Sequence, residues 1–247
     1  MCCDGVDRLG GAGGGGSDCG AINLPGPQSG VTAISGSYRN LTITGNRYVA
    51  SGTTLTVSHN LTIARGACLD AFTLGTVTVG NNIRVAKGAI LALGCTPGSL
   101  GPPFNQPPCF GQTTDDTVGR NLVADHPYTM YLDGDTIHGN LVSNGGGPGL
   151  GPPFVNFPVK DNTVDGNLIM QGWHGGWAGV IRDTVGGNVI YSRNKSVLDP
   201  DANEVQTNTV SGNLICQGNS PSAQVNPADG GMPNTVGGRK IGQCTGL

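Results

Sequence analysis

The chain has 247 residues, of which 44 are glycine, and only 12% of its residues are charged. This glycine share is more than twice the usual value of about 7%, and the charged share is about half the usual quarter. Disorder ordinarily needs high charge with low hydrophobicity, and collagen needs glycine at every third position. The composition therefore excludes both classes and leaves a folded all-β chain rich in tight turns.

The net charge is −3, and the lysines and arginines are scattered along the sequence without a run. Binding to nucleic acid is not expected, because neutralising phosphates needs clustered cations. The longest apolar stretch, near residues 89–93, is far too short to cross a bilayer. No cofactor motif is visible, so no cofactor is expected.

Eight cysteines are spread along the chain without a CxxC pair: Cys2, Cys3, Cys19, Cys68, Cys95, Cys109, Cys216 and Cys244. An even count in this arrangement favours disulfides over a zinc site, and disulfides imply an oxidising compartment. Candidate pairs are Cys95 with Cys109, which would close a loop, and Cys216 with Cys244, which would tie down the last turn. The alternative is a cytosolic protein whose reduced thiols are packed in its core.

Residues 1–20 are rich in glycine, which predicts a flexible N-terminal segment. The same residues lack the apolar stretch of a signal peptide. We expect a secreted protein on the strength of the cysteines, which requires that an export signal was removed or that Met1 is an introduced start.

A short motif recurs along the chain, and its second Asn marks each copy: Asn40, Asn60, Asn82, Asn121, Asn140, Asn167, Asn188 and Asn213. The intervals are 19 to 27 residues apart from one of 39, which fits one turn of a three-sided β-helix. Variable spacing without a strict hexapeptide period favours the right-handed kind. The sequence therefore predicts a single-domain right-handed parallel β-helix, a β-solenoid, of about eight or nine turns over residues 21–247.

Each copy has the pattern strand, two-residue corner, strand. Alternation in residues 77–85 places Val77 and Val79 inside and Thr78 outside, and then points the next aliphatic residues inward again. We expect Gly80 and Asn81 to form the corner because both tolerate positive φ. Residues 67–71 and 89–93 predict a third strand in the early turns.

Stacking the copies would build columns of like residues. The marker Asn is expected to form a ladder in which each side-chain amide bonds to its neighbours in the adjacent turns. The Asp or Asn that begins each later copy is expected to accept backbone N–H bonds. An outward Thr column is expected at Thr56, Thr78, Thr117, Thr136, Thr163, Thr184, Thr209 and Thr235.

Two near copies of a proline-rich segment, residues 97–104 and 148–154, interrupt the repeats. Proline cannot serve the ladder of a central strand, so we expect loop insertions near residues 96–114 and 145–160. Both precede a copy of the motif at a similar distance, which predicts that they leave the coil on the same side.

The later copies, of the pattern NTVxGNL, and the ending that runs from Pro233 to Cys244 resemble a group of secreted actinobacterial β-helix proteins. The resemblance covers most of residues 38–247 and implies export and a β-helix, without an activity. More distantly, the repeats are similar to the pectate-lyase-like superfamily and to the polymer-forming bactofilins. The calcium-binding Asp cluster of pectate lyases has no counterpart in any copy.

Candidate catalytic groups are few. Asp116, Asp135 and Asp183 share one column position, and paired acids hydrolyse glycosides. Asn replaces Asp at this position in other copies, which favours a turn acceptor over an acid. Among the histidines, His59 and His138 fall at corners, where we expect them to be solvated.

Both tryptophans lie in one stretch, Trp173-His174-Gly-Gly-Trp177, which follows a predicted strand. If the two indoles stand clear of the coil, they offer a platform on which sugar rings stack. The competing interpretation is a loop that folds back over the coil, or a buried contact between subunits.

The outward position of the second strand changes character along the chain. It is polar at Thr42, Thr62 and Arg84, and it is aliphatic in the later copies, at Val123, Val142, Ile169, Ile190 and Ile215. An exposed aliphatic row of this length is typical of a contact surface.

Three functions remain open, and the sequence favours a protein that is not an enzyme. The first is an extracellular structural or adhesive solenoid that associates with itself into oligomers or fibres, because the ends of a β-helix are open. The second is a polysaccharide-binding protein or carbohydrate-active enzyme that uses the loop of Trp173 and Trp177. The third is ice binding through the Thr column, whose second row does not persist.

Overall fold

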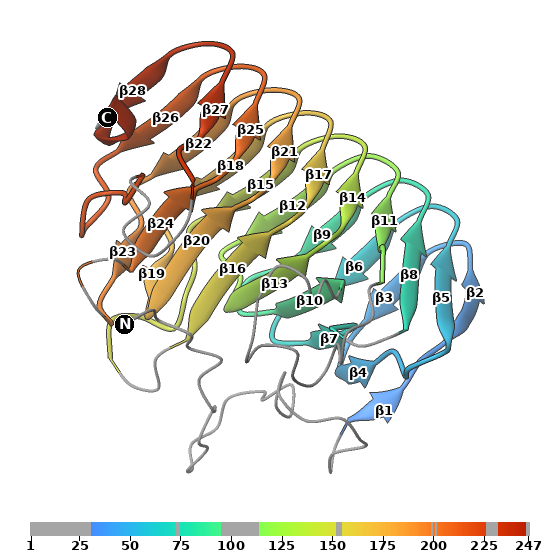
Figure 1. Cartoon of the computed structure of the whole chain (residues 1–247). Coiled ribbons are helices and arrows are strands. Elements are labelled where there is room, and N and C mark those ends of the chain that lie inside the picture. The colour runs from blue at the N-terminus through green and yellow to red at the C-terminus, as the bar shows by residue number, and fades with distance from the viewer. Residues whose placement is uncertain are drawn as a thin grey trace.

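The computed structural model describes residues 31–72, 75–94, 114–151, 155–198, 200, 202–225 and 232–245. Its strands form one elongated parallel β-solenoid of about eight turns, in which three sheets enclose a common core (Figure 1). The predicted fold class is therefore confirmed, and the handedness of the coil stays a prediction. Of the proposed boundaries, residues 1–20 lie outside the described residues.

The three sheets run along the whole coil, and a two-stranded sheet is added to the later turns. Sheet A contains β1 (Thr32–Ala33), β4 (Asn46–Tyr48), β7 (Cys68–Asp70), β10 (Ile90–Gly94), β13 (Thr129–Asp133), β16 (Asn156–Lys160), β20 (Trp177–Ile181) and β24 (Asn203–Gln206). Sheet B contains β2 (Gly36–Tyr38), β5 (Thr54–Val57), β8 (Thr76–Val79), β11 (Thr117–Val118), β14 (Thr136–Ile137), β17 (Thr163–Val164), β21 (Thr184–Val185), β25 (Thr209–Val210) and β27 (Thr235–Val236). Sheet C contains β3 (Leu41–Ile43), β6 (Leu61–Ile63), β9 (Ile83–Val85), β12 (Leu122–Asp125), β15 (Leu141–Asn144), β18 (Leu168–Gln171), β22 (Val189–Ser192), β26 (Leu214–Gln217) and β28 (Lys240–Gly242). The added sheet pairs β19 (His174–Gly175) with β23 (Lys195–Ser196).

One turn passes from sheet B through sheet C to sheet A. Turn 1 thus holds β2, β3 and β4, and the last turn, turn 9, which is incomplete in the described residues, holds only β27 and β28. Alternation sets which side chains enter the core: Val77, Val79 and Ile83 are at most 1% exposed, whereas Thr78 and Arg84 are exposed. The predicted inside and outside positions are confirmed, and the Thr column pairs in register from Thr56 to Thr235.

The corner between sheets B and C carries the predicted Asn ladder. In each turn the marker Asn donates its backbone N–H to the Oδ1 atom of the Asn one turn earlier, from Asn60 to Asn213. Most of these side chains also donate through Nδ2 to the same oxygen. The ladder ends at Arg239, whose backbone N–H donates to Asn213 Oδ1 at 2.9 Å.

Glycine is needed at this corner for a different reason from the expected one. Gly80 and Asn81 are not among the described residues with positive φ. Instead, a Cβ atom on Gly80 would lie 2.3 Å from the carbonyl oxygen of Ser58 in the preceding turn, and one on Gly187 would lie 2.6 Å from Asn167 Oδ1. At these two glycines the close approach of the preceding turn, rather than backbone conformation, leaves no room for a Cβ atom. Other turns carry a side chain at the same corner, such as Ser58 and Arg120.

A second ladder lies at the corner between sheets A and B and runs in the opposite sense. The backbone N–H of Asp135 donates to Asn162 Oδ1, that of Asn162 to Asp183 Oδ1, and that of Asp183 to Asn208 Oδ1, at 2.8–2.9 Å. The series continues from Asn208 to Asn234 at 3.0 Å. The expected role as acceptors of backbone N–H groups is confirmed for Asn162, Asp183, Asn208 and Asn234. It is not confirmed for Asp135, whose two carboxylate oxygens have no hydrogen-bond partner among the described residues. All five side chains are buried.

The proline-rich segments differ from expectation in extent and in place. Residues 95–113 and 152–154 lie outside the described residues. Asn156–Lys160 forms strand β16, so the second insertion ends earlier than residue 160. The first segment connects β10 of sheet A to β11 of sheet B, whereas the second connects β15 of sheet C to β16 of sheet A. The two therefore leave the coil at different corners, because similar spacing to the next motif does not fix which strand precedes the insertion.

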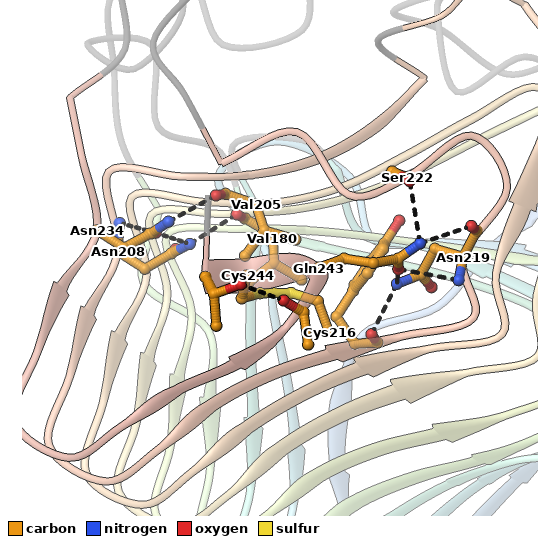
Figure 2. The surroundings of a disulfide bond; sticks show 12 residues. Val180, Val205, Asn208, Cys216, Asn219, Ser222, Asn234, Gln243 and Cys244 are labelled. Atoms are coloured by element: carbon orange, nitrogen blue, oxygen red, sulfur yellow. Dashed lines mark hydrogen bonds between the residues drawn. A yellow bond between two sulfur atoms is a disulfide. The ribbon is translucent and has the colours of Figure 1, made fainter. Parts of the chain in front are cut away.

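The end of the coil is closed at the third corner, between sheet C and sheet A. Cys216 in β26 forms a disulfide with Cys244 in the 3₁₀ helix η2 (Gln243–Thr245), across 28 residues, which confirms this predicted pair. Beside it, the side chain of Gln243 accepts from Asn219 N and Nδ2 and donates to Asn219 O (Figure 2). Cys68 is also disulfide-bonded, while Cys95 and Cys109 lie outside the described residues.

Candidate functional site

The aliphatic row predicted on the outside of sheet C exists as one continuous column. Strand pairing places its members directly opposite one another in adjacent turns: Val123, Val142, Ile169, Ile190, Ile215 and Ile241. Val123 is 37% exposed, and the others are half-buried. Ile241 was not predicted as a member of the row, and it is recognised when Arg239 is aligned with the marker Asn of the other copies.

The face around this row is uncharged over four turns. The remaining outward side chains of β15, β18, β22 and β26 are Asn144, Gln171, Ser192 and Gln217, and the four strands contain no Asp, Glu, Lys or Arg. Gln171 donates to Asn144 Oδ1 at 2.7 Å, so two of these side chains are tied to each other. The face therefore offers aliphatic and amide groups to a partner, without a charge.

The two tryptophans do not stand clear of the coil, so that expectation is wrong. Trp173 is fully buried, contacts Phe157 edge to face at a centroid distance of 5.7 Å, and donates from Nε1 to Tyr128 O at 3.4 Å. It turns inward because β19 adds a fourth side to the coil in turn 6, which widens the core. Trp173 therefore belongs to the core of the coil and not to a loop folded over its outside.

Trp177 lies on the outside of sheet A but is only 8% exposed. Its ring covers Gly179, where a Cβ atom would lie 2.4 Å from Cη2 of the indole, and it packs with Ile181. Lys160 Nζ lies 4.9 Å from the ring centroid, a cation–π contact, and burial lowers the pKa of this lysine. Between the tryptophans, His174 has a pKa lowered by burial and by the nearby charge of Lys195.

The buried Asp side chains of this column have raised pKa values. Burial raises the pKa of Asp116 to about 7, against the hydrogen bonds that its oxygens accept from Val77 N and Gly94 N. Burial also raises the pKa values of Asp135 and Asp183 well above the ordinary value, and the charges of Asp116 and Asp133 add to the effect at Asp135. Because these carboxyls are buried, none of them can reach a substrate outside the coil.

The exposed histidines form carboxylate pairs at the surface. His138 Nδ1 lies 2.9 Å from Asp165 Oδ2 at the corner between sheets B and C, and His126 Nδ1 lies 2.8 Å from Asp125 Oδ1. The described part of the chain places no third polar group with either pair as a nucleophile. Among the described residues no group of His, Cys, Asp and Glu is arranged to hold a metal ion.

Within the described ranges no helix is long and apolar enough to span a membrane. A scan of family models, a search of curated proteins and a search of solved structures each found no match to this chain. The parallel β-solenoid itself is the kind of fold that the β-helix superfamily has.

Proposed function

We propose that the chain is a non-catalytic extracellular structural solenoid that associates side by side with a second copy through the outer face of sheet C. The observation that carries the proposal is the aliphatic row from Val123 to Ile241, which continues in register through six turns. Contiguous apolar side chains that stay partly exposed on the outside of a folded protein are typical of contact surfaces.

A second copy suits this face better than a charged partner does. The outer surface of β15, β18, β22 and β26 carries no charge, so nothing on it complements a charged protein surface. Two copies related by a two-fold axis would place the same row against itself, and aliphatic and amide groups are self-complementary. Parallel-sheet faces pack about 10 Å apart when their side chains interdigitate.

Side-by-side association is favoured over stacking of the ends. At the C-terminal end, Arg239 stands in the Asn ladder position and offers no side-chain acceptor to a further turn. The Gln243 amide oxygen accepts from the backbone and side-chain N–H groups of Asn219, whose own Oδ1 accepts from Asn194 N, and the Cys216–Cys244 disulfide ties the cap to β26 (Figure 2). A head-to-tail fibre would bring this cap against Asn40, the first described Asn of the ladder, to which Arg239 presents no side-chain acceptor.

The extracellular part of the proposal rests on the disulfides. Cys216 and Cys244 are bonded to each other and Cys68 is also bonded, which fits an oxidising compartment. The resemblance of the NTVxGNL copies to secreted actinobacterial β-helix proteins points the same way.

The test is the oligomeric state of the oxidised chain by analytical ultracentrifugation. We expect wild-type protein to form dimers or larger assemblies at tens of micromolar, and Ile190→Lys, at the centre of the row, to be monomeric with an unchanged melting temperature. Thr184→Lys adds the same charge to the exposed outer face of sheet B and is expected to leave association intact. A wild-type chain that stays monomeric up to about 100 µM would overturn the proposal.

Polysaccharide binding through the Trp173 and Trp177 segment has lost its main support, because Trp173 is in the core and Trp177 is nearly covered. The matching test is glycan binding by wild-type protein and by Trp177→Ala. Binding that disappears in Trp177→Ala while the oligomeric state is unchanged would restore this function as the better one.

A further inference from the structure

Five cations that are scattered in the sequence gather around sheet C in turns 1–4, and each is exposed: Arg39, Arg65, Arg84, Lys87 and Arg120. Arg84 points outward from the middle of β9, next to Thr62 of β6 in the register. Arg65 and Lys87 follow β6 and β9 at the same corner, where Gly66 N donates to Lys87 O. The face is thus cationic where the coil begins.

The other two cations occupy the opposite corner, between sheets B and C. Backbone hydrogen bonds link this column turn by turn, from Arg39 to His59, from His59 to Asn81 and from Asn81 to Arg120. Adjacent turns of a parallel sheet are about 4.8 Å apart, so the five charges lie within roughly 15 Å along the coil.

Compensating acids are scarce on this face. Among the described residues, Asp125 at the end of β12 is the acid on it, and its carboxylate is paired with His126. Asp70 belongs to sheet A, and Asp115 precedes β11 at the corner between sheets A and B. Unbalanced charge on one flat face attracts polyanions and concentrates them there.

We propose that the cationic part of sheet C binds an acidic polysaccharide whose charges are carboxylates or sulfates. Arginine guanidinium groups bond such anions with two parallel hydrogen bonds, and four of the five cations are arginines. Thr42 and Thr62 stand in the Arg84 column and supply hydroxyl groups for sugar hydroxyls. The polysaccharide would lie along the flat face of sheet C, between the two cationic corners.

Nucleic acid fits this face less well. A flat sheet face does not enter a duplex groove, which admits a helix or a two-stranded ribbon. Single strands bind on aromatic rings, and the described strands of sheet C in turns 1–4 hold none.

The inference is independent of the proposed self-association, because the aliphatic row begins at Val123, where the cations end. Binding of hyaluronate, chondroitin sulfate, neutral dextran and double-stranded DNA to full-length oxidised protein would be measured by titration calorimetry at about 50 mM salt, where surface charges are weakly screened. We expect the two acidic polysaccharides to bind and dextran not to bind.

The decisive comparison uses two variants that each remove three exposed charges. Arg65→Gln, Arg84→Gln and Lys87→Gln together should weaken binding about tenfold, at roughly 0.5 kcal/mol for each exposed contact. Arg193→Gln, Lys195→Gln and Arg239→Gln together should change it less than about twofold, because these residues lie in later turns. Equal weakening in both variants, no binding to either acidic polysaccharide, or tighter binding to DNA would overturn the proposal.

Discussion

The early turns, residues 31–94, and the later turns, residues 114–245, contain the same three sheets but differ in the length of the corner between sheets A and B. In the early turns the corner between sheets A and B is five residues long, between β4 and β5 and between β7 and β8. From β13 onward it shrinks to two residues, one with positive φ followed by a buried Asp or Asn, as at Asp161-Asn162 and Arg182-Asp183. The second ladder therefore belongs to the later turns alone.

The Asn ladder also differs between the halves. Its backbone bonds measure 3.2–3.3 Å where His59, Asn81 or Arg120 precedes the marker Asn. They measure 2.8–2.9 Å where the preceding residue is glycine, as at Gly139 and Gly187. A Cβ atom at this position would press on the Asn one turn earlier, so glycine lets the later turns approach more closely.

The core follows the same division. Aliphatic side chains fill the early turns, whereas the later turns, widened by β19 and β23, enclose Phe157, Trp173 and Tyr191. The Tyr191 hydroxyl donates to Asn203 Oδ1 at 2.8 Å, so the wider core also holds a buried polar pair. The same repeat therefore builds a narrow aliphatic core in the early turns and a wider core with aromatic and polar groups in the later turns. In the later turns, short corners with a buried Asp or Asn replace the five-residue corners between sheets A and B.

The largest expected effect comes from removing the side chain that fills the wider core. Trp173→Ala should lower the free energy of unfolding by about 3–5 kcal/mol, because it leaves a cavity beside Phe157. Urea-induced unfolding followed by circular dichroism measures the change.

The matched control is Trp177→Ala, which removes the same side chain from the outside of sheet A. Trp177→Ala should lower the free energy of unfolding by at least about 1 kcal/mol less than Trp173→Ala does, because the vacated space opens to solvent. Equal costs would mean that the fourth side does not enclose a distinct core.

The sequence predicted what recurs and missed what occurs once. The Asn ladder, the Thr column and the aliphatic row each repeat, so a column of like residues reveals their place. Trp173 has no counterpart in other copies. Its side chain points into the core because of the inserted strand β19, and the repeat pattern does not predict that strand. The steric need for glycine at position 187 was not predicted either. It depends on the distance between adjacent turns, which cannot be derived from the sequence.

The C-terminal cap should be the next most sensitive feature. Replacing Cys216 and Cys244 with alanine together should lower the free energy of unfolding by about 2–4 kcal/mol, by the loop-closure argument. Hydrogen exchange should show faster opening of β26 and β28 and unchanged protection in β6 and β9. Uniform loss of protection along the coil would mean that the cap supports both halves.

The raised pKa values of the buried acids predict that the stability of the later turns depends on pH. The Asp183 Oδ2 atom finds no hydrogen-bond partner among the described residues, whereas Asn208, at the equivalent position, donates from Nδ2 to Val180 O and Asn234 Oδ1. Burial raises the pKa of Asp183 in the folded state. The protonated group therefore contributes stability that is complete below its unfolded pKa of about 4 and is lost as pH rises through the folded pKa.

Asp183→Asn should accordingly raise stability at pH 8 by roughly 1–3 kcal/mol and have little effect near pH 4. Thermal melts over this pH range measure the difference. Asp165→Asn changes an exposed acid that is paired with His138 and should not flatten the pH dependence. A parallel shift of both variants at every pH would show that Asp183 is not the group that titrates.

The smallest expected effect tests the spacing of turns directly. Gly187→Ala should lower the free energy of unfolding by roughly 1–2 kcal/mol, because the new Cβ atom meets Asn167 Oδ1 and Gly166 O in the preceding turn. Asn81→Ala, at the same corner position in the early turns, keeps a Cβ atom that is already accommodated and should cost less than about 0.5 kcal/mol. Since Gly187 has no positive φ, backbone strain cannot account for a difference between the two variants. Similar costs at both positions would show that the tighter Asn ladder of the later turns does not depend on glycine.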